Sequence, residues 1–155
     1  MKIINLPYDL FPAQKGKREN INFHAYTASF DSFKGKSILH TNAISLVAEG
    51  EKTMHFANKT VYAKDNEIHF LSAGNCIASV NFSRKKTFRS ILVFFDNNAL
   101  TDFYVKYARL VRDSKKNAET SSQPYVSFRK DAFITSISFI RWSCFCNRDK
   151  LYRPR

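Results

Sequence analysis

Residues 88–110 read FRSILVFFDNNALTDFYVKYARL, and this stretch decides the fold. Its first part, residues 88–95, is an almost unbroken run of apolar side chains, many of them β-branched or aromatic, which predicts a strand covered on both faces. A helix is predicted over about residues 98–112, because apolar side chains recur there at helical spacing, namely Leu100, Phe103, Tyr104, Tyr107 and Val111. The Asp-Asn-Asn break at residues 96–98 can cap this helix, since short polar side chains accept hydrogen bonds from its first amides.

Upstream of this junction the sequence predicts strands and no long helix. Alternating apolar and polar residues occur at 21–30, 37–49, 53–56, 61–63 and 67–82, and turn residues separate these segments at intervals of about ten residues. Short strands with this spacing are typical of a sandwich or a barrel, and closing the sheet removes its exposed edges. We therefore predict a jelly-roll β-barrel that leads into helices.

The segment after residue 124 has an ambiguous period. Helical spacing relates Phe133, Ile137, Ile140 and Cys144, whereas strand alternation relates Phe133, Thr135, Ile137 and Phe139. We favour a second helix over about residues 131–145, which begins at Asp131. Residues 141–155 change composition abruptly and form a basic tail, either native or the product of truncation.

Composition limits the class of protein. A chain of 155 residues predicts one domain, and no run approaches the length of a membrane helix or a signal peptide. Three cysteines give no paired disulfide framework, so we expect a cytoplasmic protein with no membrane contact. The formal charge of +12 is scattered along the chain, which favours solvated loops and a basic tail over a dedicated nucleic-acid surface.

The histidines are candidate metal ligands, because small β-barrels can hold a metal inside. The chain has His24, His40, His55 and His69, but no His-x-His pair that would place two ligands on one face of a strand. His55 and His69 alternate with large apolar neighbours, so we expect them on the opposite face of the sheet. No catalytic motif is present either, and the sequence predicts no metal, no cofactor and no enzymatic activity.

Two sets of apolar side chains are candidate binding residues. The first set follows the inward phase predicted for the strands and either lines an effector pocket or simply fills the barrel: Ile44, Leu46, Met54, Phe56, Ile68 and Phe70. The second set lies on the second predicted helix and is suited to a twofold interface: Phe133, Ile137 and Ile140. The apolar side chains of the first helix are expected to pack on the barrel.

Three segments together carry a family resemblance. They are EGEKTMHFANKTVYAKDNEIHFLSAGNCIASV (49–80), FRSILVFFDNNALTDF (88–103) and PYVSFRKDAFITSI (124–137). In this order they resemble the N-terminal regulatory domain of AraC-type bacterial transcription regulators, in the branch that contains the type III secretion activator ExsA. The resemblance covers about residues 5–140 and lies in the pattern of the whole domain rather than in one motif.

The resemblance implies an α+β fold, a cupin-like double-stranded β-barrel (jelly roll) followed by two C-terminal helices. It also implies that residues 1–140 form a non-enzymatic regulatory and dimerisation domain, which senses a small-molecule or regulatory-protein effector. In the family, DNA is bound by a separate C-terminal domain with two helix-turn-helix units, and no such domain fits after residue 140 of this chain. The rival hypotheses are a metal-dependent cupin enzyme and a nucleic-acid binder attracted by the +12 charge.

Overall fold

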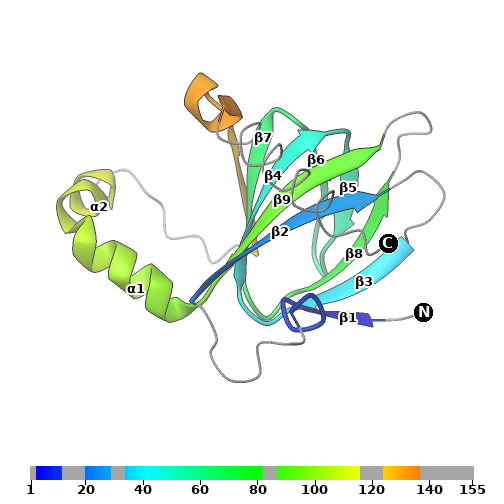
Figure 1. The fold of residues 1–155 in the computed structure, drawn as a ribbon, viewed down its shortest axis with the longest axis horizontal. Helices are drawn as coiled ribbons and strands as arrows, with labels where there is room; N and C mark the ends of the chain where they lie inside the picture. The colour runs from blue at the N-terminus through cyan, green and yellow to red at the C-terminus, as the bar shows by residue number, and fades with distance from the viewer. Residues whose placement is uncertain (1–2, 12–19, 29–33, 82–86, 116–123, 137–155) are drawn as a thin grey trace, which may run out of the picture.

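The computed structural model describes residues 3–11, 20–28, 34–81, 87–115 and 124–136. Within these ranges the chain is mainly β-structure, with two helices between the ninth and tenth strands (Figure 1). In chain order the elements are β1 (Ile3–Leu6), β2 (Ile21–Ala28), β3 (Lys34–Leu39), β4 (Asn42–Glu49), β5 (Lys52–His55), β6 (Thr60–Ala63), β7 (Glu67–Leu71), β8 (Cys76–Asn81), β9 (Phe88–Phe95), α1 (Asn97–Lys106), α2 (Ala108–Lys115) and β10 (Tyr125–Arg129).

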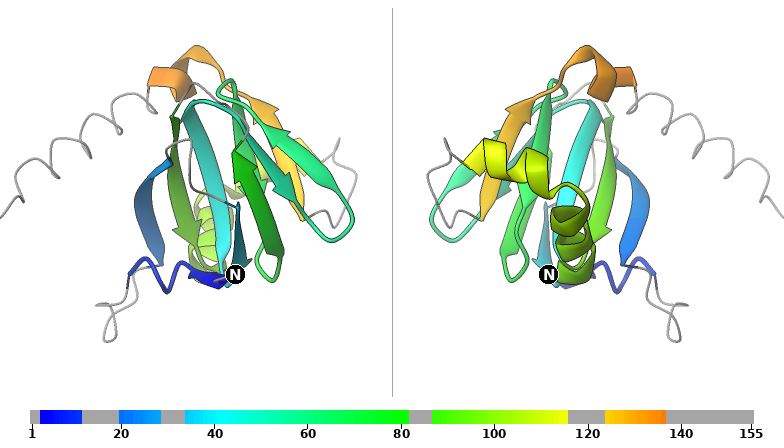
Figure 2. Two further views of the ribbon diagram at one scale, coloured as in Figure 1. Left: turned by 90° about the vertical axis from the view of Figure 1, so that its right-hand side faces the viewer. Right: turned by 90° about the vertical axis from the view of Figure 1, so that its left-hand side faces the viewer.

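The strands form two five-stranded sheets that face each other (Figure 2). One sheet has the order β1-β3-β8-β5-β6, in which β1 runs parallel to β3 and the other pairs are antiparallel. The other sheet is antiparallel throughout and has the order β10-β7-β4-β9-β2. In the described part of the chain the strands therefore make a two-layered arrangement rather than the closed barrel that we predicted. The jelly-roll connectivity stays a prediction.

The core lies between the two sheets. Fully buried apolar side chains come from both layers, among them Leu39, Met54, Ile77 and Phe94. Burying such side chains removes apolar surface from water, which is the main favourable contribution to folding. Side chains alternate along each strand, so the inward residues of β4 are Ala43, Ser45 and Val47.

The phase predicted for β4 and β7 was wrong. Ile44 and Leu46 lie on the outer face of the antiparallel sheet, where they pair in register with Phe70 and Ile68. The physical reason is that β4 carries apolar residues on both faces, so alternation alone cannot tell which face is inside. Ile44 and Leu46 have larger apolar side chains than most of the inward residues of β4, so the sequence suggests that they form the core. In the structure they cover the outer face of the sheet.

The junction between β9 and α1 confirms the prediction for residues 88–98. The Asp96 carboxylate accepts a hydrogen bond from the Ala99 amide at 2.9 Å, so Asp96 is the N-cap of α1. The predicted single helix of about residues 98–112 is divided at Tyr107, after which α2 begins. No glycine or proline lies at this break, and nothing in the local sequence explains it.

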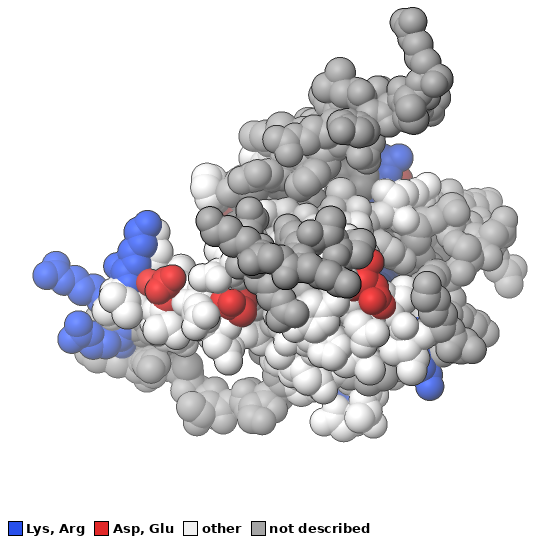
Figure 3. All heavy atoms as spheres, turned by 60° about the horizontal axis from the view of Figure 1, so that its bottom comes forward, with Lys and Arg blue, Asp and Glu red and all other residues white. Residues whose placement is uncertain are grey.

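Helix α1 does not pack on the sheets as expected. It has no buried residue, and the side chains of Leu100, Phe103, Tyr104 and Tyr107 are 37–51% exposed. Phe103 and Tyr107 pack on each other instead, with ring centroids 4.9 Å apart. The two helices project from one end of the sandwich (Figures 1 and 2), and basic side chains gather at this end (Figure 3).

Hydrogen bonds of Lys130, the residue after β10, hold the end of this strand at the edge of the sheet. The Lys130 amide donates to the Asn66 carbonyl at 2.9 Å, and the Lys130 ammonium donates to the carbonyls of Val47 and Asp65. A helical turn follows at residues 132–136, where Asp131 accepts a hydrogen bond from the Ile134 amide at 2.8 Å. The rest of the second predicted helix and the basic tail at 141–155 lie outside the described residues.

None of the helices in the described part of the chain is long and apolar enough to cross a bilayer.

Candidate effector cavity

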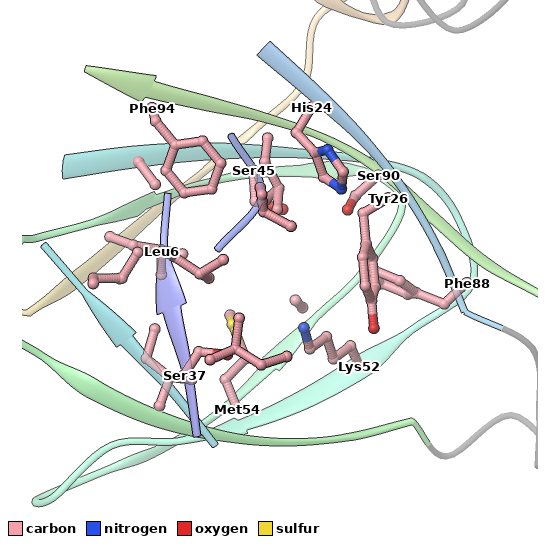
Figure 4. Close-up of a pocket in the computed structure, with 18 of the residues that line it drawn as sticks. Leu6, His24, Tyr26, Ser37, Ser45, Lys52, Met54, Phe88, Ser90 and Phe94 are labelled. Carbon is pink, nitrogen blue, oxygen red and sulfur yellow. The ribbon is translucent and has the colours of Figure 1, made fainter. Parts of the chain in front are cut away.

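A cavity of 290 Å³ lies between the two sheets (Figure 4). Its wall is mostly apolar and draws on both layers, with Leu39, Met54 and Ile77 from one sheet and Leu71, Leu92 and Phe94 from the other. Leu6 and Leu10 line it on the side of β1. This volume is near the lower end of the range for small-molecule sites in proteins.

The cavity exists because several inward positions carry small side chains. Ser37, Ala43, Ser45, Ala63 and Ser90 all line it, and they come from four different strands. Protein interiors are normally packed to the density of organic crystals, so a row of short residues opposite one another leaves space that the neighbouring large side chains do not fill. The wall around this space is therefore built into the strands rather than into a loop.

One end of the cavity is polar. The Lys52 ammonium lies 5.2 Å from the centroid of the Tyr26 ring and 5.6 Å from that of Phe88, and His24 lines the same end (Figure 4). Burial lowers the pKa of Lys52 to about 8. Burial also lowers the pKa of His24 and raises the pKa of Tyr26, so these two side chains are uncharged near neutral pH. Lys52 is then the charged group of the cavity wall formed by the described residues.

The six predicted pocket residues are placed differently from one another. Met54 lines the cavity. Phe56 is buried but packs against Tyr125, with ring centroids 5.8 Å apart, and it is not part of the cavity wall. Ile44, Leu46, Ile68 and Phe70 lie on the outer face of the sheet. Contact between these six residues and an effector stays a prediction.

Lys52, His24 and Tyr26 were not predicted as cavity residues. A signal for Lys52 was present, because it is two residues from Met54 on the same strand and therefore shares its inward face. The same alternation places His24 and Tyr26 on one face of β2. A ligand site requires polar residues at some inward positions. These three residues were not predicted because the pocket set was chosen from apolar side chains alone.

His69 is buried in the core beside the cavity, contrary to its predicted position. Its side chain is 0% exposed, and its Nδ1 lies 2.6 Å from the Tyr125 hydroxyl, with the two rings stacked. Its Nε2 lies 3.4 Å from the Lys64 carbonyl, so Nε2 donates and Nδ1 accepts from the hydroxyl. Burial lowers the pKa of His69, which keeps the ring neutral and suited to these two bonds. The pair ties β10 to β7.

The other histidines have separate local partners. His40 Nε2 lies 3.1 Å from the Asn5 side-chain oxygen, and His55 Nδ1 lies 3.0 Å from the Thr60 hydroxyl. Within the ranges that the structure describes, no three His, Cys, Asp or Glu side chains gather closely enough to hold a metal ion.

Of the predicted interface residues, only Phe133 falls within the described ranges. Its side chain is 70% exposed on the turn at 132–136. Ile137 and Ile140 lie outside the described residues. An interface formed by these three residues therefore stays a prediction.

Solved structures with this fold include ToxT from Vibrio cholerae. A ToxT structure bound to (E)-4-(8-methylnaphthalen-1-yl)but-3-enoic acid matches with a TM-score of 0.60 at 9% identity, over 82% of this chain and 49% of that chain. A second ToxT structure, in the P21 form, matches with a TM-score of 0.58 at 10% identity, over 79% and 47% of the two chains. The chain thus spans about half the length of ToxT, and at this identity the likeness shows the fold alone.

The comparison of sequences gives the family. No curated protein matches the sequence significantly. The model of the ExsA N-terminal regulatory domain matches residues 42–141, well over half of the 155 residues. The matched segment includes most of the strands of both sheets, the junction between β9 and α1, and β10. The chain therefore belongs to the ExsA N-terminal regulatory domain family, the regulatory domains of a branch of the AraC-type transcription regulators.

Proposed function

We propose that this chain is the sensor domain of an AraC-type transcription regulator, and that it binds a small-molecule effector in the cavity between its sheets. The observation that carries the proposal is the mostly apolar cavity with one charged end. ToxT supports it, because two ToxT structures are described as bound to a naphthalenyl butenoic acid and to an unsaturated fatty acid. Residues 1–140 form the regulatory and dimerisation unit in this proposal, and an adjoining helix-turn-helix domain binds the DNA.

The proposed function is regulation without catalysis. The polar groups of the cavity wall are a lysine, a histidine, a tyrosine and hydroxyl side chains, and they are held by the rigid strands of both sheets. Such a wall can bind and orient a molecule. The family assignment is to regulatory domains, which agrees with a sensor rather than an enzyme.

Strand β9 connects the cavity with the helices. Its inward residues Ser90, Leu92 and Phe94 line the cavity, and Asp96, two residues after Phe94, caps α1. A ligand that binds one orientation of β9 more tightly than another shifts the population toward that orientation. In this proposal the shift changes the position of α1 and α2, and through them the presentation of the adjoining DNA-binding domain.

Replacing Ala43 by phenylalanine is expected to abolish retention of the effector. Ala43 is buried and lines the cavity, so the larger ring occupies the volume that the ligand needs. Native mass spectrometry of the purified chain measures the bound mass. The Ala57→Phe variant is the control, because Ala57 is exposed in the turn between β5 and β6. This variant is expected to retain the same bound molecule as the unchanged protein. A molecule that stays bound to both variants would place the effector site elsewhere.

We also propose that the chain forms a homodimer through Phe133, Ile137 and Ile140. The exposure of Phe133 supports this interface, since large exposed apolar side chains mark interaction surfaces when they occur together. Ile137→Glu is expected to shift a dimer to a monomer in sedimentation equilibrium, because a buried unpaired carboxylate destabilises an apolar interface. A chain that is monomeric at high micromolar concentration, with or without this substitution, contradicts the interface.

A further inference from the structure

Lys52 is a largely buried cation for which the described residues supply no anion. Among the described residues, the carboxylate of Glu49 is paired with Arg89, with 3.3 Å between nitrogen and oxygen, and not with Lys52. Burial lowers the pKa of Lys52, and no carboxylate in the described part of the chain opposes this shift. The two rings beside the ammonium, Tyr26 and Phe88, attract a cation through their π-faces but bring no charge. A charge in such surroundings is stabilised most when an anion pairs with it.

The other end of the cavity has the opposite character. Figure 4 shows Lys52, His24, Tyr26 and Ser90 on one side of the space and Leu6 and Phe94 on the other. A molecule that fills the cavity therefore meets a cation and hydroxyl groups at one end. At the other end it meets mainly hydrocarbon, together with the Ser37 side chain. The wall is complementary to an amphiphile with one negatively charged head.

Volume and charge limit this amphiphile further. A cavity of 290 Å³ holds about ten non-hydrogen atoms when each takes about the 30 Å³ of a water molecule in the liquid. The head carries a single charge, because one lysine is the cationic group of the wall formed by the described residues. A phosphate monoester carries nearly two charges at neutral pH and would leave one of them buried without a partner.

We propose that the effector is a small amphiphilic carboxylic acid of about ten non-hydrogen atoms, whose carboxylate pairs with the Lys52 ammonium and whose hydrocarbon part lies toward Leu6 and Phe94. This inference rests on the proposed function, since it names the ligand class of the same cavity. It adds a specificity-determining residue, Lys52, and an approximate size for the part of the ligand that lies in the cavity.

The pair with Lys52 makes binding depend on pH. The pKa of Lys52 is about 8, and a paired carboxylate raises it in the complex, because the anion stabilises the protonated amine. At pH values below the lower of these two pKa values, the Lys52 amine is already charged and pH has little effect on the affinity. Between the two values, binding of the acid requires uptake of a proton, so the affinity falls by up to about tenfold for each unit of pH. The other ionisable groups of the wall, His24 and Tyr26, are neutral across this window.

Calorimetric titration with octanoic acid and with octanamide tests the inference. The two probes have the same chain length and nearly the same size, and they differ in charge. We expect the chain to bind octanoate at least about tenfold more tightly than octanamide near pH 7, because a charge-assisted hydrogen bond replaces a neutral one. Raising the pH to about 9 is expected to weaken the binding of octanoate and leave that of octanamide unchanged.

Two substitutions complete the experiment. Lys52→Met keeps the length of the side chain without the charge, and it is expected to weaken octanoate binding about 10- to 100-fold while octanamide binds as before. Unchanged octanamide binding also shows that this variant is folded. Lys64→Met removes an exposed lysine outside the cavity wall and is expected to leave both affinities unchanged.

Three results would overturn the inference. Octanamide could bind as tightly as octanoate, Lys52→Met could retain the affinity for octanoate, or neither probe could bind. The proposed function is judged separately, by the mass that the purified chain retains. If the purified chain retains a neutral molecule and Ala43→Phe loses it, the proposed effector cavity is supported. The inference that the effector is a carboxylic acid is then contradicted.

Discussion

Replacing Phe94 by alanine is expected to lower the free energy of unfolding by about 3–5 kcal/mol. Phe94 is 1% exposed and packs edge-on against Phe11, with ring centroids 6.5 Å apart. The loss has two parts, the apolar surface that is no longer buried and the void that remains. The void is not refilled here, because Phe94 already borders the cavity and its removal enlarges a space between two rigid sheets.

Urea denaturation measures this change. With a slope of about 1–3 kcal/mol per molar urea, the loss moves the midpoint of unfolding down by at least about 1 M. Phe103→Ala is the matched control, since Phe103 is 51% exposed on α1, and its substitution is expected to change stability by no more than about 0.5 kcal/mol. Equal midpoints for the two variants would mean that β9 does not form the centre of the core.

The junction of strand and helix was predictable because its signals are local. The run at 88–95 needs only its own apolar character to indicate a buried strand, and the Asp96 cap needs only its position before a helical period. The structure confirms both, with β9 at Phe88–Phe95 and α1 beginning at Asn97. The family resemblance drawn from the same residues is confirmed as well.

The cavity was not predictable in the same way, because it depends on pairing between distant strands. Ser45 faces the cavity only because β4 lies between β7 and β9 in one register, and a shift by one residue would turn Ile44 inward instead. Of the predicted pocket residues only Met54 lines the wall, since on β5 the apolar residue has polar neighbours and the phase is unambiguous. The charged end was missed because a lysine on a half-apolar strand normally indicates the solvent side.

Replacing Gly50 by alanine is expected to destabilise the protein by about 2–5 kcal/mol. Gly50 lies in the turn that carries the chain from β4 in one sheet to β5 in the other, and its φ of +83° is a left-handed conformation that costs other residues about 1–2 kcal/mol. A Cβ at this position would also lie 3.1 Å from the Thr87 carbonyl oxygen and 3.2 Å from the Phe88 Cα. Both atoms belong to the backbone at the start of β9, which cannot move without shifting the cavity wall at Phe88.

Gly74→Ala separates the two causes. Gly74 has nearly the same φ, +82°, but nothing lies within 4 Å of the Cβ that alanine would add. Its substitution is expected to cost only the backbone contribution of about 1–2 kcal/mol, and the difference between the two variants in urea denaturation isolates the contact with β9. If the two glycine variants unfold at the same urea concentration, the close approach of the β4–β5 turn to β9 contributes nothing. The position of Phe88 in the cavity wall beside Lys52 would then depend on strand pairing within the sheets and not on the turn at Gly50.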